Sequence, residues 1–341
     1  VKLFEGVEPD PSVETVMKGA EAMRAFEPDW IVAMGGGSPI DAAKAMWAFY
    51  EYPEISFEDL ITPFSFPELR QKAKFAAIPT TSGTATEVTA FSVITNYQTG
   101  VKYPLADFNI TPDVAIVDPD LVAGLPVKQV AYTGMDALTH AIEAYIGRST
   151  TKQTRAASIE AIQLIFDNLQ TAYKNGNDKT ARRNMLRASY LAGTAFTKSY
   201  VGYVHAVAHS LGGCYGIPHG LANSVLLPIV LEAYGTAAHK KLARLARITG
   251  ISDSKLDAVA AEEFINHIRS MNISMNIPET LDGIRNEDIP KLACYADKEA
   301  NPLYPVPALW GPEKLEQMYH LVQEVSEHDR NRNSEHPGKA A

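Results

Sequence analysis

Acidic and imidazole side chains recur in the second half of the chain at spacings that suit a metal ion. Asp136 stands four residues before His140, and His205 stands four residues before His209. Residues four apart lie on one face of an α-helix, so both members of each pair can reach the same ion. His219 follows a glycine-containing stretch in which the chain can turn back. One carboxylate with several imidazoles suits Zn²⁺ or Fe²⁺ better than Mg²⁺ or Ca²⁺, which prefer oxygen ligands.

The histidines also admit simpler interpretations. A single buried histidine is usually a hydrogen-bonding partner in the core, and the first aspartate–histidine pair could be a helix cap and such a histidine. Spacing alone does not decide which of His205, His209 and His219 are ligands. A zinc-protease helix is disfavoured, because Ala206 stands where that chemistry requires a glutamate as general base.

A glycine-rich turn between a strand and a helix is the first candidate for binding phosphate. The apolar run 30–34 precedes three consecutive glycines, and Ser38-Pro39 begins the next helix. Glycines let the backbone approach a pyrophosphate, and the helix N-terminus offers free N–H groups and the positive end of its dipole. The common dinucleotide fingerprint is incomplete, since Ile40 stands in place of its third glycine, and a tight strand-to-helix turn is the alternative. The candidate cofactor-binding residues here are Gly36, Gly37, Ser38 and Asp41.

A second loop of small hydroxylated residues, 80–84, follows the apolar run 75–78. Its hydroxyls could bind a phosphate or a ribose, although a solvated Ser/Thr turn is the alternative. Open α/β sheets bind ligands at the carboxyl ends of their strands, so two such loops predict one shared site. The candidates in this loop are Thr80, Thr81 and Thr84.

Alternating strands and helices are expected to position both loops. The predicted strands are 1–4, 30–34, 75–78 and 114–117, of which the last three read as buried. The first helix is predicted to begin with Asp10 as its N-cap and Pro11 at its first position. The alternation predicts an open parallel sheet with helices on both faces.

Helical patterns replace strand patterns beyond residue 127. Helices are predicted at 136–146, 158–173, 181–196 and 256–271. We therefore expect an α/β cofactor-binding domain at 1–126 and a helical metal and substrate domain at 127–327. The polar tail, 328–341, is expected to be disordered.

Composition narrows the range of partners. The chain of 341 residues carries 31 Lys and Arg against 40 Asp and Glu, a net charge of −9 that disfavours nucleic acid as a partner. Its two cysteines, Cys214 and Cys294, do not make the disulfide framework of a small secreted protein. Neither a signal peptide nor an apolar stretch of membrane-spanning length is recognisable, so a cytoplasmic protein without membrane association is expected.

Four ordered motifs resemble the signatures of the iron-containing (group III) alcohol dehydrogenases. They are GGGSPID at 35–41, PTTSGT at 79–84, GMDALTH at 134–140 and IPHG at 217–220. The similarity extends over residues 7–305. It implies the dehydroquinate synthase-like fold, in which an N-terminal α/β dinucleotide-binding domain precedes an all-α metal-binding domain and the site lies in the cleft between them. It also implies a homo-oligomer, either a dimer or larger.

The resemblance implies roles for individual residues. The ligands of Fe²⁺ or Zn²⁺ are expected to be Asp136, His140, His205 and His219. His209 is expected near the substrate and the nicotinamide as a catalytic proton relay, with a spare ligand or a packing residue as the alternatives. Gly37 and Ser38 match pyrophosphate contacts. Further contacts to NAD or NADP are matched by Thr80, Thr84, Thr89 and Lys102.

The alcohol pocket is implied at Phe196. With Tyr200 and Tyr203, this ring indicates a partly apolar pocket for a short alcohol, unless the three side chains only pack the helices. The implied activity is reversible hydride transfer between a short-chain primary alcohol or its aldehyde and NAD(P), with the alcohol oxygen on the metal. The alternatives are a glycerol or polyol dehydrogenase of the same superfamily and an inactive metal-binding fragment.

The sequence departs from the family pattern at its beginning. Family members carry a strand, a helix and a further strand before the segment that matches 3–6, and these are absent from the sequence. That segment contains the residue that separates NAD from NADP, so the choice between the two cofactors stays open. We expect the parallel sheet to lack these first strands.

Overall fold

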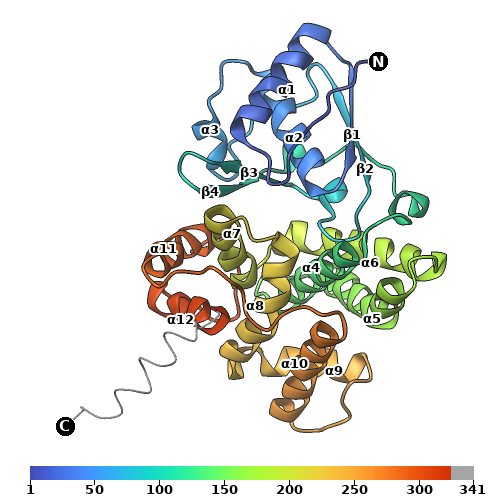
Figure 1. Cartoon of the computed structure of the whole chain (residues 1–341), viewed down its shortest axis with the longest axis vertical. Coiled ribbons are helices and arrows are strands. Elements are labelled where there is room, and N and C mark those ends of the chain that lie inside the picture. Colours follow the sequence, from blue (N-terminus) through green and yellow to red (C-terminus); the bar gives the residue numbers. More distant parts are fainter. Residues whose placement is uncertain (324–341) are drawn as a thin grey trace.

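An α/β part and a helical part follow one another along the chain, and Figure 1 shows them as the upper and lower halves of the molecule. The computed structural model describes residues 1–323. The α/β part contains α1 (Val13–Phe26), β1 (Trp30–Gly35), α2 (Gly37–Glu51), α3 (Phe57–Ile61), β2 (Lys74–Pro79), β3 (Phe91–Asn96), β4 (Val101–Ala106) and β5 (Val114–Ala115), with short 3-10 turns η1 (Thr86–Val88), η2 (Phe108–Ile110) and η3 (Pro119–Val122). The helical part contains α4 (Val127–Ile146), α5 (Lys152–Lys174), α6 (Lys179–Ser199), α7 (Tyr203–Tyr215), α8 (His219–Tyr234), α9 (Thr236–Ile248), α10 (Asp257–Ser274), α11 (Ile289–Ala300) and α12 (Pro312–Val322).

A parallel sheet in the order β1-β2-β5 forms the centre of the α/β part. The register pairs Trp30 with Lys74 and ends by pairing Gly35 with Pro79, so β1 and β2 finish at the same level. The Thr80 N–H then donates to the Gly35 carbonyl at 2.8 Å. This register brings the glycine turn and the hydroxyl-rich loop together at one edge, as the sequence predicts.

Of the predictions about strands, one was wrong and two were incomplete. β3 and β4 form an antiparallel hairpin that the expected parallel sheet did not include. Residues 1–4 form no strand. β5 covers only Val114–Ala115, although the Ile116 N–H still donates to the Ala77 carbonyl. The hairpin escaped prediction because polar residues alternate irregularly through β4, which includes Pro104.

The first helix begins two residues later than predicted. Ser12, rather than Asp10, caps α1, and its hydroxyl accepts from the Thr15 N–H. Asp10 instead has a left-handed φ of 55°. Its carboxylate contacts Lys102 at 2.7 Å, so a long-range ion pair removes this side chain from the helix end.

β1 is not the fully buried strand that its apolar run predicted. Ile31 and Ala33 face the core, whereas Trp30, Val32 and Met34 are 44%, 62% and 53% exposed. The outward side chains belong to one face of the sheet, because successive residues of a strand alternate between faces. The expected cover on both faces is therefore seen on only one face of β1 among residues 1–323.

Buried polar groups of α2 anchor the segment that follows β2. The Lys44 ammonium is fully buried and donates to the carbonyls of Thr89 and Phe91, both at 2.8 Å. The Asp41 carboxylate accepts from the Thr86 hydroxyl and the Val93 N–H. Because buried polar groups are costly unless they are hydrogen-bonded, these contacts fix η1 and β3 against α2.

α4 lies at the centre of the helical part, where it is packed by α5, α6 and α8. The predicted helices are all present and are longer than expected, except that the helix predicted to begin at residue 256 begins at Asp257. α4 begins directly after Pro126, although the domain limits at 126 and 327 themselves stay predictions. The predicted disordered tail, 328–341, lies outside the described residues.

No single helix within residues 1–323 has both the length and the apolar character needed to cross a membrane. α8 and α9 reach that length and composition only when taken together, and they are bent by 117° relative to each other.

The loop after β2 packs closely against two helices of the other half. A Cβ added at Gly83 would lie 2.7 Å from the Thr133 carbonyl oxygen of α4. A Cβ added at Gly193 of α6 would lie 2.4 Å from the Ala85 Cβ and 2.8 Å from the Val88 Cγ2. Only glycine allows this approach, and the contact joins the two halves.

We expect Gly193→Ala to destabilise the protein. Overpacking costs about 1–3 kcal/mol, whereas the gain in helix propensity is about 1 kcal/mol, so a net loss of up to about 2 kcal/mol should appear in urea unfolding followed by circular dichroism. Gly124→Ala is the control, because an added Cβ there meets no atom within 4 Å. A Gly193→Ala protein as stable as the control would contradict the close contact.

Candidate metal centre and adjoining pocket

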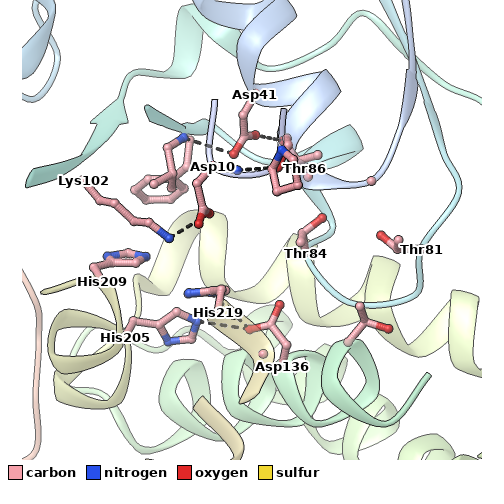
Figure 2. Close-up of a pocket in the computed structure, with 18 of the residues that line it drawn as sticks. Asp10, Asp41, Thr81, Thr84, Thr86, Lys102, Asp136, His205, His209 and His219 are labelled. Atoms are coloured by element: carbon pink, nitrogen blue, oxygen red, sulfur yellow. Dashed lines mark hydrogen bonds and ion pairs between the residues drawn. The ribbon is translucent and has the colours of Figure 1, made fainter. Parts of the chain in front are cut away.

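A cavity of about 610 Å³ lies where the α/β part meets the helical part. Figure 2 shows the loops of the α/β part on one side and the helices carrying Asp136, His205 and His219 on the other. Both sets of candidate residues thus face one space, as expected for a site in the cleft between two domains.

Four side chains place one ligand atom each within 4.8 Å of all the others: Asp136, His140, His205 and His219. Asp136 and His140 share a face of α4, His205 lies in the first turn of α7, and His219 begins α8. The Asp136 Oδ1 lies 3.4 Å from His219 Nε2, 3.7 Å from His205 Nε2 and 4.0 Å from His140 Nδ1. The chain thus brings together the four residues that the family resemblance implied.

The donor set fits a divalent transition metal. His140 Nδ1 and His205 Nε2 are buried and have no hydrogen-bond partner within the described chain. Buried polar atoms without partners are costly, and a metal ion would satisfy both nitrogens. Three imidazole nitrogens and one carboxylate oxygen make a set typical of Zn²⁺ or Fe²⁺.

Burial and neighbouring charges favour the protonation states of these side chains that can bind a cation. Burial opposes the ionised form of Asp136, but the adjacent His140 and His219 outweigh it and hold the pKa of the carboxyl well below its usual range. Burial lowers the pKa of His140 to about 3 and also lowers the pKa of His219. These two imidazoles are therefore neutral at neutral pH, the form that binds a metal.

His205 behaves differently. Burial lowers its pKa, yet the adjacent carboxylates of Asp136 and Glu143 outweigh this effect and raise the pKa to about 9. Its Nδ1 lies 2.6 Å from the Glu143 Oε2. The imidazole is thus held between two carboxylates.

Further polar contacts at the centre were not predicted from the sequence. The Asn223 amide donates to the Asp136 Oδ1 at 2.7 Å and lies 3.1 Å from the His219 Nε2. Asn223 stands four residues after His219 and Glu143 three after His140, so helical spacing was an available signal for both.

His209 lines the cavity outside the four-residue cluster. Its Nδ1 lies 2.8 Å from the Glu299 Oε1, which also accepts from the Tyr304 hydroxyl at 2.8 Å. Its ring stacks on that of His219, with 5.1 Å between centroids. The position beside the four-residue cluster agrees with the expected place of His209, whereas its role as a proton relay stays a prediction.

The candidate phosphate-binding residues mostly line the cavity. Those that do are Gly36, Gly37, Ser38, Asp41, Thr81, Thr84, Thr89 and Lys102. α2 begins at Gly37, and its N-cap, Gly36, provides no side-chain acceptor. The first-turn N–H groups of α2 are therefore available to an anion.

Asp41 and Thr80 are among the candidates that have structural partners of their own. Both oxygens of the Asp41 carboxylate are engaged by η1 and β3, so this side chain shapes the wall rather than offering free acceptors. Thr80 is not among the residues that line the cavity, and its N–H is bonded to Gly35. Contact of Asp41 or Thr80 with a cofactor stays a prediction.

Asp10 is a pocket residue that the sequence did not reveal. Its N–H donates to the Ser38 hydroxyl at 3.2 Å, and its carboxylate pairs with the buried Lys102 ammonium, as Figure 2 shows. The local sequence around Asp10 indicated only a helix N-cap, which is a different role from lining a pocket.

Phe196 borders the cavity and stacks on the ring of His140, with centroids 4.1 Å apart. Tyr203 is buried, hydrogen-bonded to Asn301, and is not part of the cavity lining. Tyr200 is also absent from the lining and packs on Phe91. Of the three aromatic candidates, the pocket interpretation therefore suits Phe196, and the packing alternative suits the two tyrosines.

Comparisons with known proteins cover nearly the whole chain. The profile of "Iron-containing alcohol dehydrogenase" matches residues 1–119, and that of "Fe-containing alcohol dehydrogenase family, C-terminal" matches residues 130–321. NADPH-dependent butanol dehydrogenase of Clostridium saccharobutylicum is 54% identical over 281 residues, covering 82% of this chain and 72% of the relative. Aldehyde-alcohol dehydrogenase of Streptococcus pneumoniae serotype 4 is 48% identical over 247 residues, covering 70% of this chain but only 28% of the relative.

The fold has a counterpart among solved structures. A 1,3-propanediol oxidoreductase superposes with a TM-score of 0.87 at 38% identity, covering 93% of this chain and 83% of the other. An alcohol dehydrogenase from Oenococcus oeni gives the same TM-score at 32% identity, covering 94% and 83%.

We expect metal-free protein to bind one Zn²⁺ per chain in isothermal titration calorimetry, and His219→Ala to weaken that binding by at least about 100-fold, because a ligand is lost rather than an outer partner. His209→Ala should keep full stoichiometry. His320→Ala, an exposed histidine of α12, is the control. Unchanged Zn²⁺ binding by His219→Ala would refute this ligand assignment.

Proposed function

Since the chain belongs to the iron-containing alcohol dehydrogenase family, we propose that it transfers hydride reversibly between NAD(P)H and a short-chain aldehyde. The observation that carries this proposal is one cavity bordered both by the four-residue cluster and by the N-terminus of α2. A metal ligand set alone would also suit a hydrolase. A phosphate-binding helix end beside it favours a nicotinamide dinucleotide as the second reactant.

The residues divide the work between the two walls of the cavity. Asp136, His140, His205 and His219 would hold Fe²⁺ or Zn²⁺, which as a Lewis acid polarises a carbonyl or lowers the pKa of a hydroxyl. The free N–H groups of the first turn of α2, which begins at Gly37, and the hydroxyl of Ser38 would orient a pyrophosphate. Such fixed contacts at both ends supply the alignment that a hydride transfer requires.

The pocket supports a small, partly apolar substrate. The Phe196 ring lies flat against the His140 ring, so an apolar surface adjoins a proposed ligand and excludes water from it. The relatives named for butanol and 1,3-propanediol agree with this size class. The glycerol dehydrogenase alternative is not favoured, because both family profiles belong to the alcohol dehydrogenase branch.

Other features of the proposal rest on the family resemblance. NAD and NADP both stay candidates, as do Fe²⁺ and Zn²⁺. Catalysis by His209, assembly into a homo-oligomer and a cytoplasmic location stay predictions.

The test is NADH and NADPH oxidation with acetaldehyde and butanal, using metal-stripped protein resupplied with Fe²⁺ or Zn²⁺ without oxygen. We expect turnover to return only with metal, because the ligand set then polarises the carbonyl, and to stay absent in His219→Ala. The preferred metal and nucleotide follow from the same assay. Folded protein with one metal ion per chain and no turnover with either nucleotide would instead favour the inactive metal-binding alternative.

A further inference from the structure

Glu143 is a buried carboxylate at the metal centre with no role in the proposed reaction. It lies on α4 and is 3% exposed. Its three hydrogen-bonding contacts are to the N–H groups of Gly202 and Val204, both at 2.9 Å, and to the Nδ1 of His205 at 2.6 Å. All three partners belong to the start of α7. A burial this deep requires that each oxygen be well paired, and here both are.

The two backbone contacts make Glu143 the N-terminal cap of α7. The N-cap residue of this helix is Gly202, which has no side chain with which to accept a hydrogen bond. The carboxylate reaches across from α4 to accept both N–H groups, and its charge faces the positive end of the helix dipole. The backbone that carries His205 is thereby fixed to the helix that carries Asp136 and His140.

The turn before this cap is strained. Tyr200, the C-cap of α6, has a φ of 61° and a ψ of −178°, a backbone conformation that residues other than glycine rarely adopt. The cost of this conformation is sustained only where surrounding contacts determine the path of the chain. The bonds from Glu143 to Gly202 and Val204 are such contacts, since they follow Tyr200 within four residues.

The third contact selects the tautomer of His205. An ionised carboxylate only accepts hydrogen bonds, so Nδ1 must carry the proton that faces the Glu143 Oε2. In the neutral form of the ring, the Nε2 is then the nitrogen whose lone pair can bind a metal. It lies 3.7 Å from the Asp136 Oδ1 and has no hydrogen-bond partner of its own within the described chain.

We propose that Glu143 is the positioning residue of the metal centre, one carboxylate that sets both the helix and the tautomer from which His205 binds the ion. The inference rests on the proposed function and deepens it. A purely structural cap would hold α7 in place without affecting which nitrogen of His205 bears the proton. The two roles therefore differ in a measurable way.

Glu143→Gln separates these roles because an amide has one acceptor and one donor side, whereas the site presents three donors. With the amide NH₂ towards His205, the Nδ1 must accept, the proton moves to Nε2 and metal binding is blocked. With the amide reversed, the NH₂ faces the Val204 N–H and the cap is weakened. Neither orientation reproduces both functions.

Glu299→Gln is the matched control. Glu299 pairs with His209 Nδ1 at 2.8 Å, so the same substitution is made beside another histidine of the same helix. His209 lies outside the ligand cluster. The control therefore removes a part-buried carboxylate–histidine pair without touching a proposed ligand.

Two readouts that do not depend on turnover test the proposal. Competition with a chromophoric chelator measures Zn²⁺ affinity, which should fall about 10–100-fold in Glu143→Gln, the range typical of an outer partner of a metal ligand, and stay unchanged in Glu299→Gln. Nitrogen NMR of ring-labelled histidine in the Zn²⁺-loaded wild type should show His205 protonated at Nδ1 and metal-bound at Nε2, with His205→Ala providing the assignment.

The outcomes are distinguishable. Zn²⁺ bound through the Nδ1 of His205 in the wild type would overturn the proposal even if Glu143→Gln fails to fold. Equal Zn²⁺ affinity in Glu143→Gln and wild type would also overturn it and leave the metal centre intact. A wild-type protein that binds no Zn²⁺ or Fe²⁺ would instead refute the proposed function itself. Glu143→Asp, which keeps an acceptor-only group, should retain more affinity than Glu143→Gln, and the reverse order would contradict the tautomer argument.

Discussion

A buried carboxylate surrounded by imidazoles is the constraint around which the molecule is organised. Asp136 keeps its charge in the interior because three histidines and an asparagine amide surround it. Such a group is costly to bury without partners, and its partners come from three helices, α4, α7 and α8. α4, α7 and α8 must therefore meet at one point, and their packing in the helical half follows from that requirement. The central position of α4 has the same origin, because it contributes Asp136, His140 and Glu143.

The α/β half meets a second constraint, since its loops must reach the same point from the opposite side. The pairing register of β1 and β2 makes the two strands end at the same level, so the loops that follow them both run towards the helices. Burial of Lys44 and Asp41 then fixes the segment after β2, so Thr84 and Thr89 keep their places in the wall. Neither half contains a complete site. The chemistry arises only where phosphate-binding loops and ligand helices face each other across the cavity.

The sequence predicted correctly those features that depend on residues close to one another in the chain. The aspartate–histidine spacing on α4 and the strand–glycine–helix turn depend on neighbours in sequence, and both are found where expected. Interactions between distant segments were not predictable from single residues. Asp10 reads as a helix cap, yet Lys102, far along the chain, competes for its carboxylate. Glu143 reads as one more residue of an amphipathic helix, and only the fold places it at the start of α7. β1 reads as buried because its composition is apolar, whereas exposure depends on what packs over it.

The glycine contacts between the loop after β2 and the helices have a consequence for motion. Thr133 and Ala85 lie against backbone at Gly83 and Gly193, so the two halves touch without intervening flexible side chains. Packed interiors transmit displacement because they have little free volume. The halves should therefore shift by small sliding movements rather than by a wide hinge. A ligand that orders the loop after β2 should also restrict the motion of α4 and α6, which the loop contacts. Loss of either half would remove the support of the other, which makes one cooperative unfolding transition the expected behaviour.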